Sequence, residues 1–200
     1  MTFARHGSLR HALRVLLACA LLSLLTACGG GRLVQPGTVE AGDIVVDTPL
    51  AWSRFTFSRY QIWTVDGIAL NRLYFIPSVR NGEHVFLERR ASKRRPDGPV
   101  YRTGMRADEI RDLLLDAFSE GGAIGIVSGD LKPVRFGDRD GLRFEFSAST
   151  DTGLLYRGQV LAAERGDTLA VVVWMAPAEF YYDRDVAGVT RLLDSARFNH

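Results

Sequence analysis

The sequence predicts an α+β domain in which a mainly antiparallel sheet of about six or seven strands carries two packed helices. Most apolar segments are short, alternate in part with polar residues, and are separated by turns that contain Gly or Asp, as in hairpins. Two other segments, 107–120 and about 179–196, repeat apolar residues at helical spacing. The 200 residues are 46% hydrophobic and 24% charged. This composition argues against a disordered chain, a coiled coil or a polytopic membrane protein.

The first strands are expected within residues 55–76. Residues 55–65 are rich in aromatic and β-branched side chains, and Asp66-Gly67 supplies the two positive-φ positions of a type I′ turn before 68–76 returns. Residues 85–87 follow the turn-like Asn81-Gly82 as a further short strand. This part of the chain therefore predicts a hairpin and one more strand.

Four further strands are expected after the first helix. Segments 134–136 and 142–148 are expected to form a hairpin around the turn 138–141. Apolar and polar residues alternate in 142–148, which predicts one buried and one solvent-exposed face. Segments 156–163 and 168–175 pair around Arg165-Gly166-Asp167. Residues 169–174 are apolar on both faces, which predicts a central, covered strand.

The two expected helices differ in how clearly the sequence marks their first residues. The first has acidic residues in its first turn, ends at Gly121-Gly122, and places these residues on one stripe: Ile110, Leu113, Leu114, Ala117 and Phe118. The second begins after Pro177, and Gly188 weakens its middle by about 1 kcal/mol relative to Ala. Its stripe consists of Val186, Val189, Leu193 and Ala196.

The order of elements is an N-terminal hairpin, a loop, an amphipathic helix, a meander and a C-terminal helix that ends in Ser195-Ala196-Arg197-Phe198. This order resembles that of the PsbP/Mog1 superfamily of α/β/α sandwiches. The resemblance covers about 150 residues and rests on element order, without a signature motif. It implies an accessory or binding role and carries no catalytic residue onto this chain.

Residues 1–27 have the features of an export signal. Arg5, Arg10 and Arg14 precede the apolar run 15–25, and no acidic residue is present. A run of this length spans roughly 16 Å as a helix, about half of a ~30 Å hydrocarbon core, and is too short for a stable transmembrane helix.

Leu25-Thr26-Ala27-Cys28, followed by three glycines, resembles a bacterial lipobox. The resemblance implies cleavage between Ala27 and Cys28, lipid on the Cys28 thiol and acylation of the new amino group. Gly29 stands where lipoproteins of the inner membrane often carry Asp, which favours the outer membrane with the domain facing the periplasm. A secreted protein with an incidental cysteine is the alternative.

Cleavage would leave a lipidated Cys28 with a flexible tether over 28–42 and a single globular domain over 43–200. It would also change the charge. The whole chain has 25 basic and 23 acidic residues, and the signal removes three Arg and no acid, so the mature chain has 22 against 23, a net of about −1. The basic pI belongs to the signal.

The mature chain offers little for metal or nucleophilic chemistry. Its histidines are His84 and His200, and Cys28 would carry lipid, so neither a histidine pair nor a free thiol remains. Ser128 lacks the spacing of a hydrolase elbow. We expect no catalytic residue and no cofactor.

A weak calcium-loop pattern begins at Asp138. The bidentate Glu of such a loop is absent, because its position is Ser149. Asp130, Asp138 and Asp140 could lie close together, but a solvated hairpin turn is the favoured interpretation and no metal is expected.

One dense cationic segment remains, formed by Arg89, Arg90, Lys93, Arg94 and Arg95. Like charges at this density cannot be buried unpaired and predict an exposed loop. Export argues against nucleic acid, so the candidate contacts are anionic lipid headgroups, lipopolysaccharide phosphates or an acidic envelope protein. A solvated loop without a ligand is the alternative.

The aromatic residues near Trp174 allow two interpretations. Phe180, Tyr181 and Tyr182 could line a hydrophobic groove or provide core contacts with one exposed ring, and the second is favoured. Overall the sequence predicts a lipid-anchored, non-catalytic binding or scaffolding domain of the envelope. An envelope hydrolase that uses Asp and Glu, and a carrier of a small apolar ligand, are the alternatives.

Overall fold

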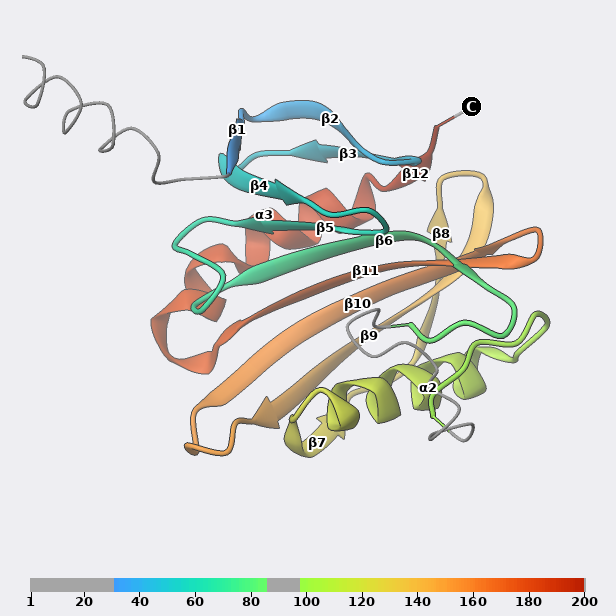
Figure 1. Ribbon diagram of the computed structural model, residues 1–200. Coiled ribbons are helices and arrows are strands. Elements are labelled where there is room, and N and C mark those ends of the chain that lie inside the picture. The colour runs from blue at the N-terminus through green and yellow to red at the C-terminus, as the bar shows by residue number, and fades with distance from the viewer. Residues whose placement is uncertain (1–30, 86–97, 200) are drawn as a thin grey trace, which may run out of the picture. The chain divides into compact units, whose positions relative to one another are not determined.

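Nine strands form the principal sheet of the computed structural model, which describes residues 31–85 and 98–199. The chain divides into two units, Met1–Arg32 and Leu33–His200, and the fold is that of the second. The sheet has the order β1-β4-β5-β6-β11-β10-β9-β7, and β8 also pairs with β9 (Figure 1). The strands are β1 (Arg32–Val34), β4 (Trp52–Thr56), β5 (Gln61–Thr64), β6 (Arg72–Arg80), β7 (Ile124–Ser128), β8 (Lys132–Phe136), β9 (Arg139–Ser149), β10 (Leu155–Arg165) and β11 (Thr168–Pro177).

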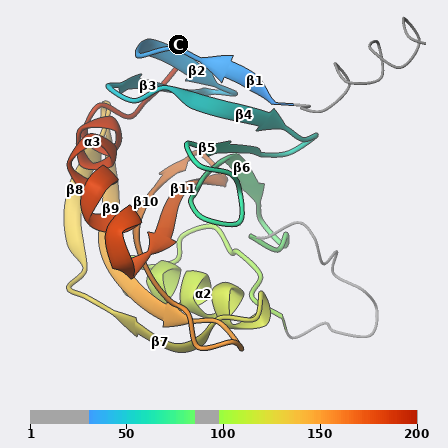
Figure 2. The same cartoon turned by 90° about the vertical axis from the view of Figure 1, so that its left-hand side faces the viewer.

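The two faces of this sheet have different covers. One face packs against helix α3 (Asp183–Asp194) and a three-stranded sheet made of β12 (Arg197–Phe198), β3 (Ile44–Thr48) and β2 (Gly37–Ala41). Among the described residues, the other face packs against helix α2 (Ala107–Glu120) and against Val85 and Tyr101 of the segment that precedes it (Figure 2). Neither described helix is long and apolar enough to cross a membrane.

Strand β11 separates two hydrophobic cores. Val172 and Trp174 point into the core on the α3 side, whereas Val171 and Val173 point into the core on the α2 side. All four side chains are buried. The prediction of a central strand covered on both faces is therefore confirmed.

Helix α2 has the predicted bounds. The Arg106 N–H donates to the Glu109 carboxylate at 2.7 Å, which satisfies a free donor at the N-terminus. At the other end the Gly121 and Gly122 N–H groups donate to the Ala117 and Ser119 carbonyls, and Gly122 adopts φ +97°. The two glycines end the helix, as expected.

The predicted number of strands was too low. Residues 32–41, expected to belong to a flexible tether, form β1 and β2, so the folded part begins near residue 33 and not at 43. Strand β2 pairs along its whole length with β3 and ends on the buried Ala41. These strands are too short for their own pattern to reveal them, because their stability comes from pairing with β3 and β4.

The N-terminal hairpin differs in detail from the prediction. The single strand expected over 55–65 is split into β4 and β5 by a turn in which the Phe57 N–H donates to the Tyr60 carbonyl. The turn before β6 is not type I′, because Asp66 has a negative φ. Instead the Asn71 side chain accepts from the Thr64 hydroxyl at 2.7 Å and from the Val65 N–H at 2.9 Å. A buried amide thus fixes a longer turn.

One later turn also differs from the prediction. The β8–β9 turn is Gly137-Asp138, with Gly137 at φ +62°, so Asp140 and Gly141 belong to β9 and not to the turn expected over 138–141. The β10–β11 hairpin around Gly166-Asp167 is confirmed. Of the strand expected over 85–87, only Val85 lies within the described residues.

Helix α3 begins at Asp183, not near 179. The preceding residues 178–182 form a π-helical turn in which Glu179 is extended and Phe180 has φ +66°. This turn places Tyr182 against Trp174 with ring centroids 4.9 Å apart and leaves Phe180 67% exposed. The aromatic segment therefore provides core contacts and one exposed ring, as the favoured interpretation predicted.

Candidate functional site

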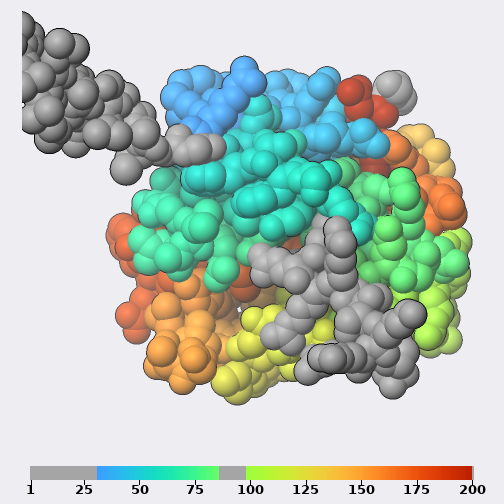
Figure 3. Space-filling view, in the orientation of Figure 1, coloured from blue at the N-terminus to red at the C-terminus, as the bar shows by residue number. Residues whose placement is uncertain are grey.

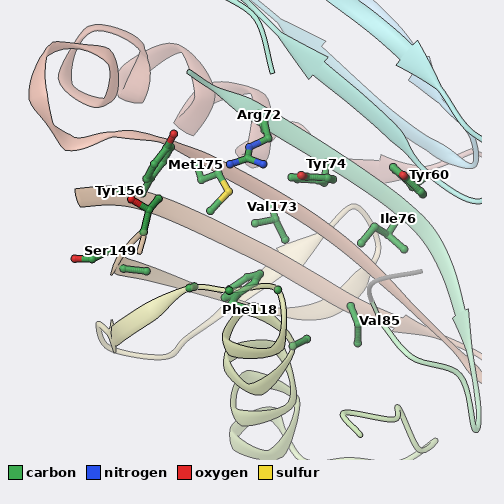
Figure 4. Close-up of a pocket in the computed structure, with 16 residues that line it drawn as sticks. Tyr60, Arg72, Tyr74, Ile76, Val85, Phe118, Ser149, Tyr156, Val173 and Met175 are labelled. Carbon is green, nitrogen blue, oxygen red and sulfur yellow. The ribbon is translucent and has the colours of Figure 1, made fainter. Parts of the chain in front are cut away.

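A cavity lies where α2 ends. The helix has 14 residues and is about 21 Å long, whereas β9 and β10 each have 11 residues and run for about 36 Å. Part of the sheet face thus extends past Gly121 without a helix above it. The cavity at this position has a volume of about 260 Å³ (Figure 4).

Strand register brings the lining side chains to one face. Arg72 of β6 lies opposite Met175 of β11, and Tyr74 lies opposite Val173. Because side chains two residues apart point the same way, these four residues face α2 together. Phe118 of α2 lies across the cavity from them (Figure 4).

Gly158 of β10 makes room beside the cavity. A Cβ at this position would lie 2.4 Å from the Trp174 carbonyl oxygen and 2.5 Å from the Phe146 ring. The absence of a side chain lets Phe146 lie flat across β10 and stack on Phe118, with ring centroids 4.7 Å apart. This pair fills the sheet face next to the cavity and limits its extent along α2.

Arg72 supplies the charge of the site. Among the described residues that line the cavity it is the one cation, and none is Asp or Glu. Its guanidinium lies 5.9 Å from the centre of the Tyr156 ring, an arrangement that favours a cation–π contact. In Figure 4 the group extends from β6 past Met175 into the cavity.

Tyr156 joins the cavity wall to a neighbouring turn. Its ring is 6% exposed, and its hydroxyl donates to the Ala69 carbonyl at 2.8 Å. The β5–β6 turn is thereby tied to the start of β10. Arg72 immediately follows that turn, so the bond helps to fix the position from which its side chain enters the cavity.

An ion pair holds the same turn to α3. Arg184 donates to Asp66, and it also pairs with Asp185 at 2.6 Å. The hydrogen bond from Arg184 keeps the pKa of the Asp66 carboxyl below its ordinary value. The turn beside the cavity is therefore anchored from both sides of the sheet.

Exposed apolar side chains gather at this end of the sheet. They lie on the β5–β6 turn, at the β9–β10 turn and on the segment after β11: Val65, Ile68, Leu154, Leu155 and Phe180, each at least 40% exposed. The two turns flank the left-hand end of the view in Figure 3. The β9–β10 turn adjoins the cavity through Thr150, which accepts from and donates to Leu154 and also lines the cavity.

No described lining residue of the cavity is one of the predicted site residues. Ala27 and Cys28 lie outside the described residues, as does the whole cationic segment made of Arg89, Arg90, Lys93, Arg94 and Arg95. Two of the three aspartates of the weak calcium-loop pattern form ion pairs. Asp140 contacts Arg135 at 2.5 Å and Asp138 contacts Arg139 at 3.8 Å. No group of three metal-ligating side chains occurs in residues 31–85 and 98–199.

Sequence reasoning missed Arg72. The signal was present in the alternation of β6, where Arg72 occupies the same face as Tyr74 and the buried Ile76. A cation on the apolar face of a strand is unusual, because charged side chains are rarely placed in a core without a partner. The position of the cavity, in contrast, depends on where α2 lies on the sheet, and no local pattern contains that information.

Comparison with known proteins gives similarity in fold alone. No family model and no curated protein matches the chain. Among solved structures, the chain is similar to the Ran-binding protein Mog1p of Saccharomyces cerevisiae, with 7% identity and a TM-score of 0.48 over 83% of this chain and 94% of that one.

Two other solved structures are similar at comparable distance. One is LpqN of Mycobacterium tuberculosis, described as involved in cell envelope biogenesis, with 11% identity and a TM-score of 0.35 over 86% of each chain. The other is a protein of Bacteroides thetaiotaomicron, with 8% identity and a TM-score of 0.47 over 84% of this chain. The present chain spans about half of that protein, covering 50% of its length.

Proposed function

We propose that the mature chain is a lipid-anchored, non-catalytic binding domain of the cell envelope. The observation that carries this proposal is the apolar cavity with one fixed cation at the end of α2, a composition typical of sites that hold small molecules. General acid–base catalysis needs a suitable titrating group close to the substrate. The described lining residues supply no histidine, cysteine or carboxylate, which favours binding over the alternative of an Asp/Glu hydrolase.

The N-terminal pattern supports the anchor. A lipobox that ends at Cys28 implies several acyl chains, and two or more chains hold a soluble domain on a bilayer stably. Since β1 begins at Arg32, three glycines separate Cys28 from the first strand, and this spacer reaches about 14 Å at most. We propose the periplasmic side of the outer membrane as the location, because Gly29 follows the cysteine.

The anchor is tested by labelling cells with radioactive palmitate. We expect the wild-type chain to take up label and Cys28→Ser to lose it completely, because the thiol is the acceptor. Cys19→Ser is the matched control, since this cysteine lies within the signal and would be removed with it. Label that persists in Cys28→Ser would disprove the anchor.

The cavity favours a second, more specific role within this proposal, that of a carrier for a small ligand with an apolar body. A carrier needs a largely apolar site that does not alter its cargo, and the cavity at the end of α2 favours that role. Anchoring at Cys28 would keep such a carrier close to the lipid phase.

The cationic segment from Arg89 to Arg95 is proposed as the contact for a further partner, either anionic lipid or an acidic envelope protein. Arginine forks bind phosphate and carboxylate oxygens in pairs, and such contacts weaken as salt is added. We propose no role for nucleic acid.

A further inference from the structure

Within the described part of the chain, the charge of Arg72 has no acidic partner. Its Nε is buried and makes no hydrogen bond with a described residue. Within residues 31–85 and 98–199 no carboxylate forms an ion pair with it, and the Tyr156 ring at 5.9 Å is its recorded contact. A buried donor without a partner costs free energy, so proteins rarely retain one that has no use.

The surroundings do not compete for this cation. The lining contains no acidic residue among those described. The carbonyls in the last turn of α2, which would otherwise attract a cation, accept hydrogen bonds from the N–H groups of Gly121, Gly122 and Ala123. The positive charge of Arg72 is therefore left for a ligand.

Apolar side chains form much of the remaining wall, which also includes Tyr60, Tyr74, Tyr156, Ser149 and Thr150. Val173 and Met175 form its floor on β11, and Phe118 faces them from α2. The volume of about 260 Å³ would hold roughly nine water molecules at ~30 Å³ each, which corresponds to a ligand portion of about nine or ten non-hydrogen atoms. The site combines one fixed positive group with a short apolar chamber.

We propose that this cavity binds a single-headed anionic amphiphile, whose carboxylate or phosphate pairs with Arg72 and whose alkyl chain lies against Val173, Met175 and Phe118. The proposal deepens the binding role put forward above and rests on it. The pairing is an equilibrium contact in which no covalent bond forms or breaks. The planar fork of Arg72 accommodates two oxygens of a carboxylate or phosphate at once.

The test is isothermal titration calorimetry of the full chain in nanodiscs of zwitterionic phosphatidylcholine, with empty nanodiscs as the blank. Octanoate and octyl phosphate distinguish a fatty-acid head from a phosphate head. Octanol and octyltrimethylammonium present the same chain with no charge and with the opposite charge. We expect at least one of the anions to bind ten times or more as tightly as octanol, and the cation to bind no more tightly than octanol.

Variants separate the head contact from the chain contact. Arg72→Met keeps the side-chain length and removes the charge, and should weaken binding of the preferred anion about ten- to hundredfold while leaving octanol unaffected. Ala123→Leu fills the chamber from the end of α2 and should weaken every probe. Arg80→Met, at the exposed far end of the same strand, is the matched control and should change nothing. Circular dichroism shows whether each variant is folded.

The outcomes divide clearly. Equal affinity for octanol and both anions, or anion binding that Arg72→Met leaves intact, would overturn the role of Arg72 but leave a binding cavity. If none of the probes binds the folded wild-type chain, the anionic-amphiphile proposal fails. The proposed envelope anchor is then judged separately by the labelling of Cys28.

Discussion

The two faces of the principal sheet differ in how completely other elements pack against them, and the packing of their hydrophobic cores differs accordingly. On one face α3 and the small sheet together bury Trp52, Trp63 and Trp174, each 1% exposed or less. On the other face α2 is the one described helix; it stops at Gly121, and a cavity follows. Val173 and Trp174 are neighbours on β11, yet one borders the cavity and the other lies in a filled core. The difference comes from the elements that pack against each face, not from β11 itself.

The largest expected effect lies on the filled face. Trp174→Ala should lower the free energy of unfolding by about 3–5 kcal/mol, because the indole stacks on Tyr182 and its removal leaves a cavity with no means to close. Met175→Ala, one residue along and beside an existing cavity, should cost less than half as much. Urea unfolding measures both, and equal losses would show that the two faces are equally packed.

A smaller effect is expected at the boundary of the cavity. Gly158→Ala forces a Cβ against the Trp174 carbonyl and the Phe146 ring, so it should destabilise the chain by roughly 1–3 kcal/mol. Gly129→Ala is the control, since a Cβ there meets its nearest neighbour at an ordinary 3.6 Å. A neutral Gly158→Ala would mean that Phe146 does not lie across β10.

The smallest effect concerns the turn that Asp66 and Arg184 hold beside the cavity. Because the pKa of Asp66 is lower in the folded chain than in the unfolded chain, its contribution is present above about pH 4 and is lost as the pH falls through the folded value. Asp66→Asn should therefore cost less than about 1 kcal/mol at pH 7 and flatten the acid-dependent loss of stability. Arg184→Met should flatten it likewise. If the stability of both variants fell with decreasing pH as steeply as that of the wild type, the pairing of Asp66 with Arg184 would be contradicted.

The elements with strong local patterns could be predicted from the sequence. The apolar stripe and the two terminal glycines define α2 at both ends, and the double-sided apolar run in β11 predicts its central place. Strands β1 and β2 could not be predicted in this way, because pairing with partners far along the chain stabilises them. The π-helical turn was hidden for a similar reason, since the stacking of Tyr182 on Trp174 accompanies the positive φ of Phe180.

Only part of the candidate site could be predicted from the sequence. The cation of Arg72 on an apolar strand face is visible in the sequence, whereas the cavity requires the relative lengths and positions of α2 and the sheet. Sequence motifs for catalysis consist of histidine, cysteine and paired carboxylates, and an arginine among tyrosines and aliphatic side chains forms none of them.

The central claim is that the open face binds a ligand and the filled face does not. Intermolecular NOE measurements between octanoate and the full chain test this claim directly, because Met175 and Trp174 are adjacent in sequence and lie on opposite faces. We predict NOEs from the octanoate chain to the methyl groups of Met175 and Val173, and none to the indole of Trp174. NOEs to Trp174 or to Leu192 of α3, without any to Met175, would contradict the account.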